Sequence, residues 1–356
     1  MRREVFFSVC IPNFNYARYL GETLRSVLAQ DFPHFEVIVA DNASTDDSVA
    51  VVEALANSRV RLIRNPVNFG FAANLDRATE AASGNHLLLL SSDDLMRPGA
   101  LTEYSRILES LGERASRAVL TSALDLVDAE GRLVGVQYRP RGELFYTRSN
   151  SVSEETEGSE GLTMTPGLKA LRESLLRKDS PAAFLATCYS RELYEAVGGY
   201  RSSYRVFPDS HFLNKLLAED ALLVYVPKRL FAYREHGENQ LAVEAGQGAL
   251  KYQVDAYLHS IEIPEEVLRR IDLRREDLVR VFVDRAVIDR GLQSLAAGQS
   301  VKGFRLLAFA IATYPGVAIK MVKSWALAFL VAIGPIGTWM ARGLYARRVR
   351  RRAPRP

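Results

Sequence analysis

The chain has 356 residues, of which 48% are hydrophobic and 25% are charged, with 46 Lys and Arg against 42 Asp and Glu. This composition is typical of a folded protein and excludes a disordered or low-complexity chain. The two cysteines, Cys10 and Cys188, lie in no metal-binding spacing, which excludes a disulfide-stapled scaffold and disfavours structural zinc. The apolar run 5–11 is too short for a secretory signal, so we expect the soluble part to stay in the cytoplasm.

The first 125 residues alternate short apolar runs with segments of helical periodicity. Apolar and β-branched runs predict strands at 5–11, 36–40, 59–64, 86–90 and 118–122. Apolar residues at helical spacing predict helices at 17–29, after Asp46, at 68–82 and at 101–111. A strict alternation of this kind is typical of a mostly parallel sheet covered by helices. We therefore expect an α/β fold.

The later residues complete this domain and then change character. Residues 139–166 are rich in Ser, Glu and Gly and predict a mobile loop. Further elements are expected as a helix at 166–178, an apolar run at 182–190, a helix at 210–218 and a strand at 222–226 that ends at Pro227. We expect domain boundaries that separate residues 1–240, a charged helical segment at 241–300 and an apolar helical hairpin with an Arg-rich tail at 301–356.

Three predicted strands end in polar residues. Asn13 follows the first strand, Asp41 follows the second, and Asp93 and Asp94 follow the strand at 86–90. In open α/β sheets, ligands bind beyond the carboxyl ends of the strands. No glycine-rich phosphate loop follows the first strand, so the charge of a phosphorylated ligand needs another neutralising group.

Asp93 and Asp94 can supply this neutralisation indirectly, through a bound cation. A carboxylate pair at the end of a buried strand can hold a divalent cation that also binds diphosphate oxygens. The alternative is that both aspartates cap the turn into the next helix. The residues themselves leave both interpretations open.

Three sequence stretches carry a resemblance to a known family. They are SVCIPNFNYARYLGETLRSVLAQDFPHFEVIVADNASTDDS at 8–48, NPVNFGFAANLDRA at 65–78 and GNHLLLLSSDDLMRPGAL at 84–101. In this order and at these separations, they resemble family 2 glycosyltransferases of the GT-A fold. The resemblance is strong over residues 5–125 and weaker over 180–240. It implies a Rossmann-like GT-A domain and an enzyme that transfers a sugar from a nucleotide sugar with inversion.

The resemblance also implies site residues at the first two strand ends. Pro12, Asn13 and Phe14 correspond to the family's nucleotide pocket, with Phe14 offering an aromatic face to the base. Asp41 corresponds to the residue that accepts a hydrogen bond from the base, in the manner of uracil recognition. The alternatives are a core aromatic at Phe14 and an Asx turn at Asp41.

At the third strand end, the family pattern places Asp93 near the ribose and makes Asp94 a ligand of Mg²⁺ or Mn²⁺. Further along, Tyr-Arg-x-His at 233–236 resembles the family's closing segment. It implies that Arg234 contacts the donor and that His236 approaches the diphosphate or the metal. A structural role is the alternative for both residues.

The catalytic base is expected in the second half of the domain. The family places an acidic residue at the start of a helix after a Gly-Gly-aromatic turn, and Asp209 occupies that position after Gly198-Gly199-Tyr200. As a base it would deprotonate the acceptor hydroxyl. Pro208 and Ser210-His211 depart from the family pattern, and Asp209 can also act as a helix cap. The rival acidic pair, Glu219-Asp220, is expected at a solvated corner.

The basic residues are concentrated at the C-terminal end. Residues 342–356 hold seven of the 46 basic residues and no acid, which leaves the rest of the chain slightly acidic. Trp325 and Trp339 flank the apolar segment just before them, as in an interfacial belt. This pattern favours an anionic membrane surface as partner, at the inner face of the plasma membrane, and gives no support to nucleic acid. A hairpin packed on the catalytic domain is the alternative.

Together these features predict a metal-dependent inverting glycosyltransferase. The expected donor is a nucleotide-diphosphate sugar, UDP-linked, and the expected acceptor is a glycan or lipid-linked acceptor in cell-surface polysaccharide synthesis. Two alternatives remain: a nucleotide-sugar-binding protein whose site has lost activity, and a sugar nucleotidyltransferase. The second alternative lacks the glycine-rich and basic loop that holds a triphosphate.

Overall fold

The computed structural model describes residues 4–55, 57–151, 161–200, 208–237 and 250–352. The described chain divides into two compact units. The first unit comprises residues 1–171, 180–203 and 207–243, and the second comprises 172–179, 204–206 and 244–356. Each unit is described separately below.

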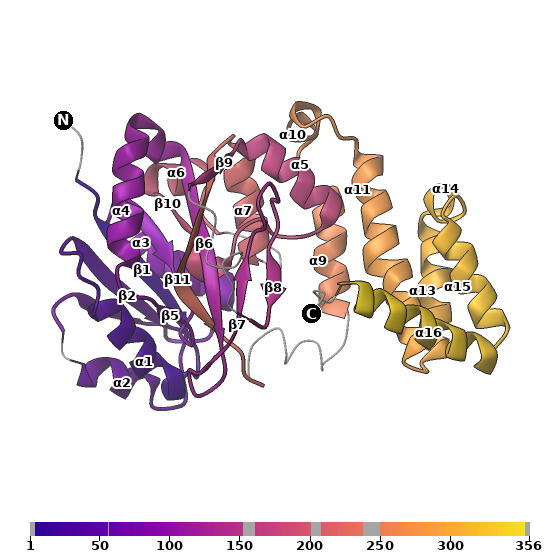
Figure 1. The fold of residues 1–356 in the computed structure, drawn as a ribbon, viewed down its shortest axis with the longest axis horizontal. Coiled ribbons are helices and arrows are strands. Elements are labelled where there is room, and N and C mark those ends of the chain that lie inside the picture. The colour runs from indigo at the N-terminus through magenta and orange to yellow at the C-terminus, as the bar shows by residue number, and fades with distance from the viewer. Residues whose placement is uncertain (1–3, 56, 152–160, 201–207, 238–249, 353–356) are drawn as a thin grey trace. The chain divides into compact units, whose positions relative to one another are not determined.

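The first unit begins as expected from the sequence, with alternating strands and helices (Figure 1). The strands β1 (Phe7–Asn13), β2 (Phe35–Asp41), β3 (Val60–Arg64) and β4 (His86–Leu89) lie parallel in the order β3-β2-β1-β4. The helices that connect or follow them are α1 (Ala17–Leu28), α2 (Ser48–Ala54), α3 (Phe71–Ala81) and α4 (Ala100–Leu111). On α1, the fully buried Leu20, Leu24 and Val27 form the apolar face that packs into the core.

The remainder of the sheet is mixed. The strand β6 (Ala118–Val127) pairs in parallel with β11 (Leu222–Arg234), and β10 (Cys188–Ser190) lies antiparallel between β4 and β6. Short antiparallel strands complete the sheet: β5 (Leu95–Met96), β7 (Leu133–Tyr138), β8 (Thr147–Ser149) and β9 (Thr163–Thr165). The α/β fold class is therefore confirmed, with parallel pairing concentrated in the first half. Of the predicted mobile loop at 139–166, residues 152–160 lie outside the described residues.

The prediction that Pro227 ends a strand is wrong. Strand β11 continues through Pro227 to Arg234, and its pairing with β6 shifts register between Val226 and Arg229 and again before Phe231. A proline cannot donate a hydrogen bond to a ladder, so a register irregularity is where a strand tolerates one. The longer strand brings Arg234 and the following residues to the end of the sheet where β4 finishes.

Shorter helices fill the first unit between these strands. They are the 3₁₀ helices η1 (Gly112–Arg117) and η2 (Phe184–Ala186) and the α-helices α6 (Arg191–Ala196) and α7 (Pro208–Ala218). The helix α5 (Gly167–Arg177) begins in this unit, and its last residues belong to the second unit.

The second unit is helical. Its helices are α9 (Leu250–Ile261), α10 (Glu265–Arg270), α11 (Arg275–Val281), the π-helix η3 (Phe282–Ile288), α12 (Asp289–Ala296), α13 (Ser300–Thr313), α14 (Pro315–Ala318), α15 (Val322–Ala332) and α16 (Pro335–Arg352). Phe282, Val287, Leu295 and Leu327 belong to its separate core. Among the described helices, we find none that is both long and apolar enough to cross a bilayer.

Candidate functional site

The ends of β1 and β2 are joined through polar side chains. Asn13 and Asp41 are register partners, and Asn13 Nδ2 donates to Asp41 Oδ1 at 2.9 Å. Ser44 closes the arrangement, because its hydroxyl donates to Asp41 Oδ1 at 2.5 Å and its backbone N–H donates to Oδ2 at 3.0 Å. All three oxygen contacts hold the Asp41 carboxylate in one orientation, as an Asx turn does. Asp41 therefore has the geometry of an Asx turn, and its carboxylate is at the same time a hydrogen-bond acceptor held in a fixed position at the end of β2.

The loops around this pair are strained and carry an exposed ring. Asn15 and Ala43 have φ values of 59° and 62°, which is unfavourable for a residue with a side chain, above all for Ala43. Asn15 is held by Ser44, whose Oγ accepts from the Asn15 backbone N–H at 2.9 Å. Phe14 is 40% exposed, so it is not a core aromatic, whereas Pro12 is buried within β1. The two loops thus place an open aromatic ring beside the Asn13–Asp41 pair.

Asp93 and Asp94 lie in a turn directly after β4, at the same edge of the sheet. Thr23 of α1 donates through its hydroxyl to the Ser92 carbonyl at 3.0 Å and holds this turn. Asp94 Oδ1 accepts from the Arg234 backbone N–H at 2.9 Å, whereas Asp94 Oδ2 is buried with no hydrogen-bond partner among the described residues. Burial, and next the charge of Asp93, raise the pKa of Asp94 well above its ordinary value. A buried carboxylate oxygen of this kind favours a bound cation.

Arg234 is fully buried beneath this turn. Its Nε donates to the Asp93 carbonyl at 2.8 Å, and its Nη1 and Nη2 donate to the Ala129 carbonyl at 3.0 Å and to Glu22 Oε2 at 2.7 Å. These bonds occupy three guanidinium nitrogens with protein groups. The geometry therefore places the Arg234 side chain against the Asp93–Asp94 turn, and its contact with the donor stays a prediction.

His236 contacts Asp93 rather than the open oxygen of Asp94. Its Nε2 lies 3.0 Å from Asp93 Oδ2, and its ring lies 4.5 Å from the ring of Tyr19, centroid to centroid. The ring of Tyr16, which precedes α1, lies 6.0 Å from the His236 ring, centroid to centroid. His236 thus connects the Asp93–Asp94 turn to the start of α1.

The residues expected to hold a metal do not form a protein-only site. Within the part of the chain that the structure describes, no group of three or more His, Cys, Asp and Glu side chains is arranged to bind a metal ion. Mg²⁺ and related ions are commonly held by one or two carboxylates together with substrate phosphates. The unpartnered Asp94 Oδ2 fits that mode of binding.

Asp209 lies in the first turn of α7 and is partly buried. Its charge acts on Tyr200, whose pKa is raised well above the ordinary value, chiefly by burial. The rival pair lies at the opposite end of α7: the Glu219 carbonyl accepts from Arg117, and Asp220 Oδ1 accepts from the Leu168 backbone N–H at 3.2 Å. Glu219 and Asp220 are therefore used in contacts at the far end of the helix.

Three residues of the site were missed in the sequence. Ser44 could have been found, because a serine three residues after a loop aspartate is a common turn pattern. Glu22 and Tyr19 carry no such signal, since both look like ordinary positions of the α1 helix. Only the fold shows that they contact Arg234 and His236.

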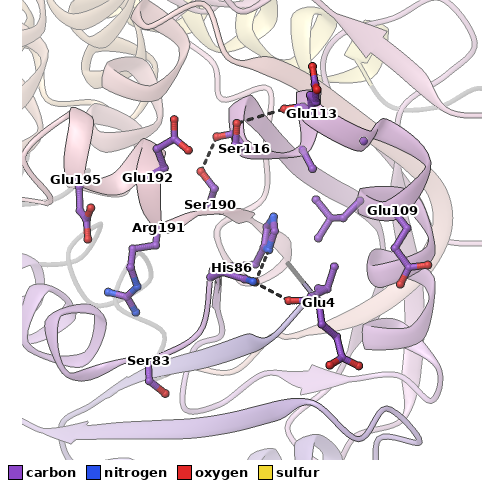
Figure 2. Close-up of a pocket in the computed structure, with 15 residues that line it drawn as sticks. Glu4, Ser83, His86, Glu109, Glu113, Ser116, Ser190, Arg191, Glu192 and Glu195 are labelled. Carbon is purple, nitrogen blue, oxygen red and sulfur yellow. Dashed lines mark hydrogen bonds between the residues drawn. The ribbon is translucent and has the colours of Figure 1, made fainter. Parts of the chain in front are cut away.

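Figure 2 shows a cavity of about 1160 Å³ that lies elsewhere. It surrounds His86, the first residue of β4, whereas Asp93 and Asp94 follow the last residue. Glu4, Glu109, Glu113 and Glu192 line it, and burial lowers the pKa of His86 to about 4. None of the predicted site residues lines this cavity.

Sequence comparisons agree with the resemblance described above. Residues 8–122 match the model of the family described as glycosyl transferase family 2. An uncharacterized protein of Mycobacterium tuberculosis is 28% identical over 229 residues, which are 64% of this chain and 66% of the relative. A putative teichuronic acid biosynthesis glycosyltransferase of Bacillus subtilis is 32% identical over 110 residues, which are 30% of this chain and 42% of the relative. The chain thus spans less than two thirds of both relatives.

Solved structures share the fold. Staphylococcus aureus TarS 1–349, solved in complex with UDP-GlcNAc, superposes with a TM-score of 0.63 at 17% identity, over 96% of this chain and 92% of that one. A mannosyltransferase from Pyrobaculum calidifontis, in complex with GDP-Man and Mn²⁺, gives a TM-score of 0.52 at 17% identity, over 98% of this chain and 87% of that one. Residues 8–122 are thus similar to glycosyl transferase family 2, and the chain shares the fold of these solved structures.

Proposed function

We propose that the protein transfers a sugar, with inversion, from a UDP-linked donor to a glycan or lipid-linked acceptor in cell-surface polysaccharide synthesis. One observation carries this proposal. The Asn13–Asp41 pair and the Asp93–Asp94 turn lie at the same edge of the parallel strands. The Asp93–Asp94 turn contains a buried carboxylate oxygen, Asp94 Oδ2, without a hydrogen-bond partner among the described residues. The first group suits a nucleoside base, and the second suits a diphosphate–cation pair.

Each donor-side residue has a proposed part. The fixed carboxylate of Asp41 accepts a hydrogen bond from the base, and the exposed Phe14 ring covers one face of it. Pro12 and Asn13 form the floor at the end of β1, and Asp93 faces the ribose. UDP is proposed as the nucleotide because TarS, which shares the fold, was solved with UDP-GlcNAc.

Mg²⁺ or Mn²⁺ is proposed as the cofactor, with Asp94 as its protein ligand and His236 beside it. When bound, the ion supplies Lewis-acid stabilisation of the leaving diphosphate. Arg234 and Glu22 hold the Asp93–Asp94 turn in place from below, so that the carboxylate is oriented before the donor arrives. The Mn²⁺ complex of the mannosyltransferase supports this choice of ion.

Asp209 is proposed as the base that takes the proton of the acceptor hydroxyl. Its place in the first turn of α7 fixes the carboxylate at the end of a helix whose other end is anchored through Asp220. The proposed acceptor class is supported by relatives described as a putative teichuronic acid biosynthesis glycosyltransferase and a succinoglycan biosynthesis protein.

The second unit is proposed to attach the enzyme to the inner face of the plasma membrane. On α15, the exposed residues Val322, Trp325 and Phe329 recur at helical spacing and form an apolar face, while Leu327 and Leu330 face the core. Helix α16 repeats this pattern with Ile336 and Trp339, which is 75% exposed. Large exposed apolar faces mark interaction surfaces.

Charge favours a lipid surface as the partner of these faces. From Arg290 to Pro356 the sequence contains twelve Lys and Arg residues and no Asp or Glu. Basic segments next to interfacial helices are attracted to the anionic lipids of the cytoplasmic leaflet. Exposed tryptophans suit the headgroup region.

The proposal is tested by donor turnover. Purified full-length protein is incubated with a panel of nucleotide sugars, with Mn²⁺ or with EDTA, and the release of nucleoside diphosphate is measured. We expect release from one UDP-sugar, with Mn²⁺ only. Nucleotide binding without release would instead support a site that has lost activity, and formation of a sugar nucleotide from a sugar phosphate would support a nucleotidyltransferase.

A further inference from the structure

Arg139, which follows β7, is a buried cation without an anionic partner among the described residues. Its side chain is only 6% exposed, and all three guanidinium nitrogens are buried without a hydrogen-bond partner among the described residues. Two tyrosine rings enclose it: the guanidinium carbon lies 5.2 Å from the ring centroid of Tyr146 and 4.7 Å from that of Tyr225. Cation–π contacts compensate a buried charge only in part.

Other arginines of the same unit differ in this respect. Arg97 and Arg229 both contact Asp125, at 2.6 Å and 2.9 Å, and Arg234 contacts Glu22 at 2.7 Å. Burial of a guanidinium without such a partner is costly, and proteins rarely retain it without a compensating group. Arg139 therefore has the properties of a residue whose anion comes from a ligand.

The sheet register shows which face Arg139 occupies. Tyr225 lies opposite Thr121, and Tyr189 lies opposite Val119, two residues earlier on the same strand. Directly opposed residues share a face, as do residues two apart, so Tyr225 and Tyr189 point to the same side of the sheet. Phe212 of α7 packs on Tyr189 at 5.1 Å between ring centroids. Arg139 thus lies on the face that α7 covers, and the first turn of α7 contains Asp209.

The surroundings of Arg139 suit a desolvated oxyanion. The Arg139 backbone N–H donates to the Tyr225 hydroxyl at 2.9 Å, and the Tyr146 hydroxyl lies 2.7 Å from Thr121 Oγ1. Tyr225 is buried and Tyr146 is partly buried. The Tyr146 hydroxyl also donates to the Ser122 carbonyl at 2.9 Å.

We propose that Arg139 binds the oxyanion of an acceptor that carries a phosphate or carboxylate group. Guanidinium pairs with both groups in a bidentate manner, and the pairing is strongest where water is excluded. The acceptor assignment rests on the glycosyl transfer proposed above, whereas the binding of an oxyanion does not.

The test measures the melting temperature of the full-length protein in EDTA as inorganic phosphate or acetate replaces chloride at constant ionic strength. We expect one of these anions to raise the melting temperature of the parent by several degrees, and which one does so distinguishes phosphate from carboxylate. Arg139→Met should remove this response. Arg229→Met, the matched control, should keep it while melting at a lower temperature, because Asp125 loses a partner.

The starting stability supplies a second readout. Since Arg139 has no ion pair to lose within the described part of the chain, Arg139→Met should melt at or above the temperature of the parent. If this variant does not fold, Arg139→Lys replaces it and should show a weakened response, because lysine cannot form the bidentate pair. An unchanged anion response in either variant, or no response to either anion in the parent, would overturn the proposal.

Donor hydrolysis with Mn²⁺ separates this inference from the proposed function. We expect the parent and Arg139→Met to hydrolyse the donor at equal rates, which would show that Arg139 does not bind the donor. Loss of hydrolysis in Arg139→Met would assign the residue to the donor and overturn the acceptor assignment. If the parent hydrolyses no donor, the proposed function fails, and the anion titration alone still decides whether Arg139 binds an oxyanion.

Discussion

Replacement of Asp94 by Asn tests the central electrostatic feature of the site. The asparagine keeps an Oδ1 atom that can accept from the Arg234 backbone N–H, but it removes the buried charge. Burial and the neighbouring Asp93 raise the pKa of Asp94 in the folded protein above its value of about 3.9 in an unfolded chain. The folded state of the parent therefore holds this proton more tightly than the unfolded state does.

The sign of the effect follows from that difference. As the pH rises through about 4, the unfolded parent releases the Asp94 proton first, so this group lowers the stability of the parent until its folded pKa is passed. Each unit of the pKa difference corresponds to about 1.4 kcal/mol. In EDTA, Asp94→Asn should therefore be more stable than the parent at pH 7, and the difference should vanish near pH 3.

Mn²⁺ should reverse the order of stability. A ligand present at about 100 times its dissociation constant stabilises the folded state by about 2.7 kcal/mol, or roughly 3–4 °C in melting temperature for a protein of this size. The parent, with nucleotide present, should gain this shift and Asp94→Asn should not. Thermal unfolding monitored by circular dichroism measures both effects.

Asp125 provides the matched control. It is also buried, but it contacts Arg97 and Arg229 at 2.6 Å and 2.9 Å. Asp125→Asn should lower stability at pH 7 and leave the response to Mn²⁺ unchanged. The reasoning is refuted if Asp94→Asn retains the Mn²⁺ shift, or if it melts below the parent in EDTA at pH 7.

Four further variants test the remaining assignments. Asp209→Asn should leave the nucleotide dissociation constant unchanged in calorimetry and reduce transfer to an acceptor at least about a hundredfold, as expected for loss of a general base; unchanged transfer would redirect attention to the other acids of the domain. Arg234→Met should lower the free energy of unfolding by about 2–3 kcal/mol in urea titrations, because charge-assisted hydrogen bonds are lost. His236→Phe keeps the ring packing and loses the contact to the neighbouring carboxylate, so the KM for donor should rise about tenfold, a change of about 1.4 kcal/mol; an unchanged KM would contradict a role for this contact. The double variant Trp325→Ala, Trp339→Ala should bind anionic vesicles at least about tenfold more weakly in sedimentation, while donor hydrolysis stays unchanged. If the parent instead forms oligomers that dissociate in this variant, the partner of these faces is a second copy of the chain.

The strand ends were the most predictable part of the site. Asn13 and Asp41 follow neighbouring parallel strands, and residues at the same level of two such strands lie side by side. In the structure, Asn13 Nδ2 lies 2.9 Å from Asp41 Oδ1. The long, periodic elements before residue 125 were likewise readable from spacing. The short strands β5 and β8 were not, because two or three residues pair only where the rest of the sheet offers an edge.

The contacts below the aspartates could not be predicted. Arg234 and Glu22 are 212 positions apart in the sequence, and nothing local distinguishes a guanidinium that supports a turn from one that binds phosphate. The same holds for Arg139, whose buried position depends on Tyr146 and Tyr225 from separate segments. In both cases the chemistry of the residue is visible in the sequence, but its environment depends on tertiary packing.

The irregular strand β11 links two parts of the molecule that would otherwise be independent. Tyr225, before the register shift at Pro227, encloses Arg139, and Arg234, after it, supports Asp93 and Asp94. Alternate residues of a strand point to opposite faces of the sheet. The number of residues in this irregularity therefore determines which face Arg234 occupies once the face of Tyr225 is set. Deletion of one residue there would leave either the arginine–tyrosine cluster or the aspartate turn facing the wrong side, so the spacing between them is itself a requirement of the fold.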